Sequence, residues 1–117
     1  MNVVYKYRLM PGSPSVVEMP KYARVVYVGA QDDGPVLWAL VDTEQPIERR
    51  EFWVYGTGHT IDVSRPKVHI GTCQTESGLV WHVFELDADR EWAQGVFSAS
   101  SVSTSWSSDD PPSVSHE

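Results

Sequence analysis

The residues best suited to chemistry stand together in one short stretch, Tyr55-Gly56-Thr57-Gly58-His59. Two glycines around a hydroxyl predict a sharp exit from a strand, because glycine serves where the backbone needs a positive φ or a close approach. His59 could act as a general base, with Asp62 or Asp42 orienting it. The backbone N–H groups of residues 56–59 could instead cradle an anion such as phosphate. The structural alternative is that His59 bonds to the backbone and holds the turn, and the lack of a phosphate-loop lysine favours it.

Four further residues carry reactive groups without a recognisable motif. His82 is expected to be a core or half-buried histidine with a satisfied hydrogen-bond partner, and His69 is expected on the solvent face of a strand. Three histidines on separate strands could converge on a metal, but none has ligand spacing, so we expect no metal site. Cys73 is expected to be a buried, inert thiol, and Ser64 lacks a nucleophile motif. We therefore assign no catalytic residue and no cofactor.

Large apolar side chains occupy both parities of the segment 51–55. Along a strand, Trp53 and Tyr55 share one face and Phe52 and Val54 share the other. A small sandwich has one core, so one pair must face away from it, where a ligand, an oligomer partner, or the chain's own loops and tail would cover it. We predict ligand or partner contacts at Trp53, Tyr55, Gly56, Thr57, Gly58 and His59. If the ligand is a phosphate, the reserve candidates are Arg49, Arg50, Arg65 and Lys67.

The elements that position these residues are strands joined by turns. Strand-like segments span residues 3–9, 16–19, 24–31, 36–41, 51–55, 68–74 and 79–86. The run Asp32-Asp33-Gly34 predicts a hairpin turn, and the apolar run 36–41 predicts a strand buried on both faces at the centre of a sheet. Residues 42–49, with Pro46 as a breaker, are expected to form a connection. Seven short strands predict a mainly all-β fold, a small antiparallel β-sandwich or barrel.

Composition limits the cellular setting and the partners. The chain has 117 residues, a net charge of −7 and a single cysteine, which excludes an intramolecular disulfide and favours a reducing compartment. No apolar run is long enough to span a bilayer, and the N-terminus lacks signal-peptide features. An acidic chain is poorly suited to nucleic acid, and the pair Arg49-Arg50, flanked by Glu48 and Glu51, is expected to be a solvated edge. We expect a cytoplasmic protein with neither nucleic-acid nor membrane partners.

The C-terminal part differs in composition from the rest. Residues 87–94 predict a short helix, with Gly95 as its stop signal. Residues 98–117 are rich in serine and proline and carry acidic residues, so they cannot bury enough apolar area to offset the entropy of ordering. We therefore expect one β-rich domain over residues 1–97 and a flexible tail over 98–117. Trp106 in that tail is either a docking anchor or an incidental aromatic residue.

Several motifs in a fixed order carry a family resemblance. They are Glu18-Met19-Pro20-Lys21, Val28 with Gln31, Gly34-Pro35, Leu37-Trp38-Ala39-Leu40-Val41-Asp42, Tyr55-Gly56-Thr57-Gly58-His59, Ile70-Gly71-Thr72 with Gln74, and His82-Val83-Phe84-Glu85. Together they resemble a family of short uncharacterised proteins of bacteriophages and prophages, over roughly residues 3–86. Thr43 and Thr60 stand where that family usually has proline. The resemblance implies a phage-encoded accessory protein in the cytoplasm of a bacterial host, and it transfers no catalytic residue.

These observations favour a binding function. We expect a non-enzymatic accessory protein that sequesters or blocks a host protein or a small anionic metabolite, and it could also form a homo-oligomer. One alternative is a small hydrolase-like enzyme that uses His59. Another is a minor structural or assembly protein, which the small size and acidic tail disfavour.

Overall fold

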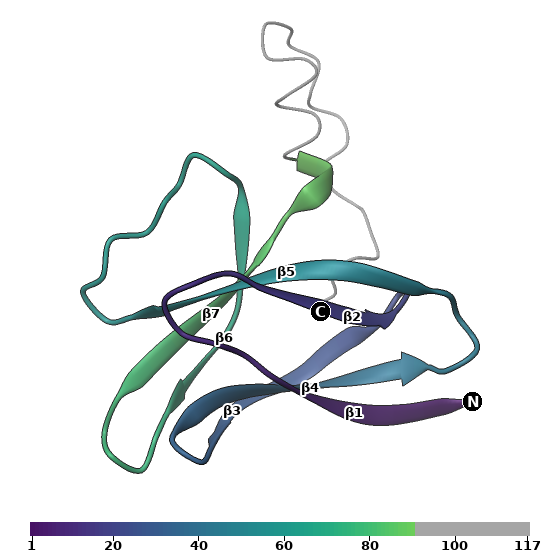
Figure 1. The fold of residues 1–117 in the computed structure, drawn as a ribbon, viewed down its shortest axis with the longest axis horizontal. Helices are drawn as coiled ribbons and strands as arrows, with labels where there is room; N and C mark the ends of the chain where they lie inside the picture. Colours follow the sequence, from purple (N-terminus) through teal and green to yellow (C-terminus); the bar gives the residue numbers. More distant parts are fainter. Residues whose placement is uncertain (91–117) are drawn as a thin grey trace, which may run out of the picture.

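The chain folds into two antiparallel β-sheets packed face to face (Figure 1). The computed structural model describes residues 1–90. Its seven strands are β1 (Asn2–Arg8), β2 (Ser15–Pro20), β3 (Arg24–Gln31), β4 (Gly34–Asp42), β5 (Ile47–Gly56), β6 (Lys67–Gln74) and β7 (Val80–Leu86). The prediction of a mainly all-β sandwich of about seven strands is confirmed.

One sheet has three strands in the order β1-β4-β3, and the other has four in the order β2-β5-β7-β6. β4 is central in its sheet, as predicted. Leu37, Ala39 and Val41 point from β4 into the core and are fully buried. Trp38 and Leu40, on the opposite face, are only half-buried, whereas Val36 on that same face is fully buried. The predicted burial on both faces therefore holds only near Val36.

The turn between β3 and β4 is the tight hairpin expected from the sequence. Asp32 and Asp33 both have positive φ, 52° and 64°, which is the requirement of a type I′ turn. Asp33 also reaches the β6–β7 hairpin, where its carboxylate accepts hydrogen bonds from the hydroxyl of Ser77 at 2.8 Å and from its backbone N–H at 3.4 Å. The tips of two hairpins, one from each sheet, are therefore tied together.

The core between the sheets is apolar and draws on both of them. Its fully buried members include Met19, Leu37, Phe52 and Val83. β3 and β6, the edge strands on one side, pack against each other at Val28 and Gly71. A Cβ atom on Gly71 would lie 2.6 Å from the Val28 side chain, so only glycine allows this approach. A register irregularity in the β6–β7 pairing falls between His69 and Gly71.

β5 begins earlier than the sequence indicated. Residues 47–49, expected in the connection, belong to this strand together with Arg50. They pair with β2, with Arg49 opposite Glu18. The expectation of a solvated Arg49-Arg50 pair is wrong for Arg50, which is 6% exposed and points into the core. Its guanidinium forms a two-bond ion pair with Glu85 of β7, at 2.6 Å and 2.9 Å. Burial raises the pKa of Glu85, and Arg50 acts in the opposite direction.

The described chain ends just after β7. Residues 88–90 are helical, which agrees with the start of the helix expected over 87–94. The rest of that segment, the domain boundary at residue 97, the tail over 98–117 and Trp106 lie outside the described residues. Within residues 1–90, no helix is long and apolar enough to cross a membrane.

Candidate functional site

The outer face of the four-stranded sheet carries two rows of side chains across β5, β7 and β6. Strand register places Trp53 beside Phe84 and Phe84 beside His69 in the first row. In the second row, Tyr55 is opposite His82 and His82 is opposite Thr72. Phe52 and Val54 point into the core, so Trp53 and Tyr55 are the pair that faces outward. We call this surface, formed by the two rows and Thr57, the outer β5–β7–β6 face.

Aromatic contacts run continuously across this face. Trp53 and Tyr55 lie nearly parallel, with ring centres 6.2 Å apart and 12° between their planes. Tyr55 meets Phe84 edge to face at 5.8 Å, and Phe84 meets His69 at 5.2 Å. His69 is exposed and the other three are half-buried. Such an array offers apolar contact area whose geometry is already fixed.

Charged side chains surround Trp53 at its end of the face. Glu51 accepts hydrogen bonds from the Trp53 indole N–H at 2.7 Å and from Arg65 at 3.2 Å. The ammonium of Lys67 lies 4.8 Å from the centre of the Trp53 ring and donates to the backbone carbonyls of Asp62 and Arg65. These contacts draw the end of the β5–β6 loop against Trp53. Among the four basic residues considered for a phosphate ligand, Arg50 is ion-paired with Glu85 in the core and cannot reach a surface ligand.

The glycine loop folds as a turn held by its own histidine. Gly56 donates its backbone N–H to Nδ1 of His59 at 3.1 Å, and the backbone N–H of His59 donates to the Gly56 carbonyl at 3.0 Å. Gly58 has a φ of 89°, as a sharp strand exit requires. A Cβ atom on Gly56 would lie 2.8 Å from the His59 ring. His59 therefore holds the turn through the backbone, which is the structural alternative to a catalytic role.

The carboxylates considered as orienters for His59 are engaged elsewhere. Asp62 accepts from the hydroxyl and backbone N–H of Ser64, and Ser64 leads the groups that lower the pKa of Asp62. Asp42 lies on β4 in the other sheet, where it accepts from the backbone of Glu44 and from the terminal amine. Within the described residues, His59 hydrogen-bonds only to Gly56. Residues 1–90 therefore place no carboxylate against His59 to form an acid–base pair.

A hydrogen-bonded chain of four polar side chains runs beside the aromatic array. Thr57 Oγ1 lies 2.7 Å from Nε2 of His82, and Nδ1 of the same ring lies 3.0 Å from Thr72 Oγ1. Thr72 Oγ1 is in turn 2.9 Å from Nε2 of His69. The expected half-burial and satisfied partner of His82 are confirmed, although its ring lies on the outer face and not in the core.

This polar chain escaped the sequence analysis for a reason of register. His69 and Thr72 are three positions apart, and regular alternation would place them on opposite faces of β6. The irregularity between His69 and Gly71 inserts an extra residue in the β6 ladder and brings both side chains to the outer face. Only the motif Ile70-Gly71-Thr72 hinted at this, because a glycine within a strand often marks a bulge.

The remaining candidates do not join this face. Cys73 is buried, and burial raises the pKa of its thiol. Trp38 lies on the outer face of the three-stranded sheet, where it contacts Tyr27, and Trp81 packs against the core. Among residues 1–90, no group of three or more histidine, cysteine or acidic side chains is arranged to hold a metal ion. Two buried polar atoms, the Tyr55 hydroxyl and the Trp81 indole N–H, have no hydrogen-bond partner in the described part of the chain.

Comparison with known proteins then places the chain. Residues 1–94 match the family described as a domain of unknown function, DUF7352. The chain belongs to this family. The match covers the whole sandwich, including the outer β5–β7–β6 face. Comparison with curated proteins and with solved structures gave no match.

Proposed function

We propose that this member of the DUF7352 family is a phage-encoded, non-enzymatic accessory protein that acts by binding. The contact surface is the outer β5–β7–β6 face, and the bound molecule is a small anionic ligand that the protein sequesters. The test must distinguish this ligand from the other possible target, a host protein that the same face would block. The phage origin rests on the sequence motifs alone.

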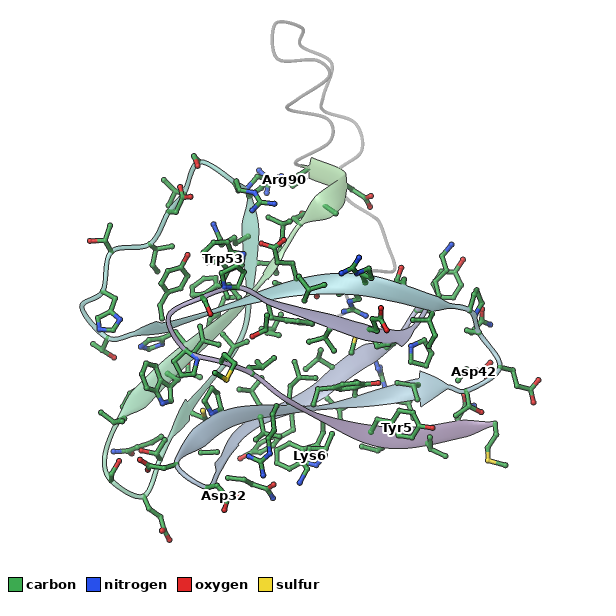
Figure 2. All side chains as sticks on the ribbon, in the orientation of Figure 1. Tyr5, Lys6, Asp32, Asp42, Trp53 and Arg90 are labelled. Carbon is green, nitrogen blue, oxygen red and sulfur yellow. The ribbon has the colours of Figure 1, made fainter. Side chains whose placement is uncertain are left out.

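The observation that carries the proposal is the aromatic array on the side of the sheet away from the core. Trp53, Tyr55 and Phe84 contact one another in a fixed geometry, and the exposed His69 extends the array (Figure 2 labels Trp53 on β5). A sandwich this small already has its core between the sheets, so this array is not needed to build it. Aromatic side chains offer large contact area at a low entropic cost.

The polar groups on the same face favour an anion over an apolar ligand. The face carries two imidazoles and two hydroxyls in one hydrogen-bonded chain, and Lys67 stands at its other end. The described part of the chain is otherwise acidic, with nine basic and twelve acidic residues before position 91. A concentration of donors and protonatable groups on one face of an acidic protein is suited to a negatively charged ligand.

The test is native mass spectrometry of the full chain freshly purified from a bacterial lysate. We expect a mass excess that corresponds to a small molecule and is lost in Trp53→Ala. The matched control is Tyr27→Ala, because Tyr27 is an exposed aromatic residue (64%) on the other sheet. The proposal would be overturned if the mass excess survived Trp53→Ala. It would also be overturned if no excess were found and the chain captured a host protein equally well with and without Trp53.

A further inference from the structure

We propose that Thr57, Thr72, His69 and His82 form a proton-linked oxyanion site, which binds a phosphate, sulfate or carboxylate group when His82 is protonated. This inference rests on the proposed function and deepens it, since it names the ligand chemistry and the donors. It starts from the hydrogen-bonded chain that links these four side chains across the β5–β6 loop, β6 and β7.

Counting hydrogens shows what protonation does to this chain. A neutral imidazole has one N–H donor and one acceptor nitrogen. Each ring nitrogen of His82 lies against a different threonine hydroxyl. When the ring is neutral, one of these two hydroxyls must donate its hydrogen to the unprotonated nitrogen. In the imidazolium form both nitrogens donate, and both hydroxyls can accept without loss of a bond. Protonation therefore preserves the network and releases a hydroxyl hydrogen.

The released hydrogen is available to a ligand. Thr57, Thr72 and His69 are exposed and His82 is half-buried, so an anion can reach the donors without disturbing the core. The protonated site then offers hydroxyl donors beside a positive charge. Hydrogen bonds of this charge-assisted kind are shorter and stronger than neutral ones.

The carboxylates of residues 1–90 that lie near this end of the face are bound to other groups. In residues 1–90, no carboxylate forms an ion pair with either imidazole. On β5, Glu51 is held by Trp53 and Arg65, and on β7 Glu85 points inward to Arg50. In the β5–β6 loop, the Asp62 carboxylate accepts a hydrogen bond from Ser64. His59 of the same loop accepts one from the backbone N–H of Gly56.

The other basic groups on this face give His82 no negative partner. Lys67 on β6 lies over Trp53 at the other end of the face, and His69 on β6 shares Thr72 with His82. Tyr55 on β5 is opposite His82 and carries no charge in this pH range, because tyrosine ordinarily titrates near pH 10 and burial raises the pKa of its hydroxyl further. Within residues 1–90 an imidazolium here has no ion-pair partner, and a bound oxyanion would supply one.

The experiment is a titration of the full chain with sulfate at constant ionic strength, followed through the histidine ring resonances by NMR. Sulfate keeps its charge across this range, so any pH dependence belongs to the protein. Histidine is the side chain that changes charge in this window, so we expect binding to be roughly tenfold tighter at about pH 5.5 than at about pH 8. His82→Gln should abolish this difference.

Thr57→Val tests the hydroxyl without touching the packed rows, and it keeps the test open if His82→Gln does not fold. It should weaken sulfate binding at acid pH roughly tenfold. Thr60→Val is the matched control, since Thr60 is an exposed threonine in the same loop, and it should bind like the original chain. Unsaturable resonance shifts at acid pH, or binding unaltered in Thr57→Val and His82→Gln, would overturn the site.

Phenyl sulfate distinguishes the source of the anion. Equal affinity for sulfate and phenyl sulfate supports a free anion as ligand. Tighter binding of phenyl sulfate, lost in Phe84→Leu, supports an anionic group carried on a larger molecule that extends over the aromatic array. Failure of every sulfate titration would remove the oxyanion site, while a small-molecule mass excess dependent on Trp53 would still stand for the binding function.

Discussion

Arg50 and Glu85 form an ion pair inside the sandwich, and the same guanidinium also donates to the backbone carbonyl of Ala23 at 2.6 Å. The side chains of the pair are only 5% and 8% exposed. Because Ala23 immediately precedes β3, one arginine ties two strands of the four-stranded sheet to the start of a strand in the other sheet. The two charges satisfy each other, and neither can be removed alone without leaving the other buried.

We expect Glu85→Ala to destabilise the fold by about 3–5 kcal/mol, because it strands the Arg50 charge in the core. Urea unfolding monitored by tryptophan fluorescence measures this change. Glu76→Ala, at an exposed turn position, is the control and should change stability by less than about 0.5 kcal/mol. Replacing both partners with Arg50→Met and Glu85→Leu should cost less than Glu85→Ala alone. A double variant that is less stable than the single one would contradict this account.

The approach of β6 to β3 gives a second expectation. Gly71→Ala should destabilise by about 1–3 kcal/mol, because the added methyl group meets Val28 and forces the two edge strands apart. Thermal unfolding is a sufficient measurement. Gly34→Ala is the matched control within a strand, since a Cβ atom there would meet only the Gln31 carbonyl at 3.9 Å. Equal melting temperatures for the two variants would mean that the contact between β3 and β6 accommodates the methyl group without cost.

Gly58 tests backbone conformation without packing. Its φ of 89° is unfavourable for L-residues, yet nothing lies within 4 Å of a Cβ atom built there. Gly58→Val should therefore cost more than about 1 kcal/mol from backbone strain alone. Gly58→Asn should cost less, since asparagine tolerates positive φ better than a β-branched residue. If valine and asparagine were equally tolerated in urea unfolding, the turn would not need its glycine.

The tie between Asp33 and Ser77 predicts a pH dependence. Hydrogen bonds, led by that from the Ser77 hydroxyl, lower the pKa of Asp33. A lowered pKa contributes stability above the ordinary aspartate range, near pH 3.9, which is lost as pH falls through the folded-state value. Ser77→Ala should thus be less stable than the original chain at neutral pH and converge with it in acid. Ser13→Ala, at another exposed turn, should run parallel to the original chain at every pH.

Local pattern was enough to predict most of the fold. Alternation along 51–55 gave the correct faces for Phe52 and Trp53, and the Asp32-Asp33 pair gave the hairpin turn, because each depends on neighbours in sequence. The early start of β5 was missed because Arg50 looks like a surface residue until Glu85, thirty-five residues later, is placed beside it. The sequence left two roles open for His59, and the structure has the one in which the ring bonds to the backbone of Gly56.

The polar chain on the outer face lay beyond sequence analysis for the same physical reason. Its four members come from a loop and two strands, and their meeting depends on a register irregularity that composition does not reveal. The sequence linked His69 and His82 only through a metal site, which it disfavoured, and it predicted no contact for Thr72. Pairing of strands, not local propensity, creates this arrangement.

β7 serves both sides of its sheet. Val83 and Glu85 hold the core and its ion pair, while His82 and Phe84, the residues alternating with them, belong to the outer β5–β7–β6 face. A genetic screen that scores loss of function at these positions would therefore confuse depletion of the folded protein with loss of recognition. Abundance must be measured alongside activity for every allele in this strand, because adjacent codons report on different properties of the molecule.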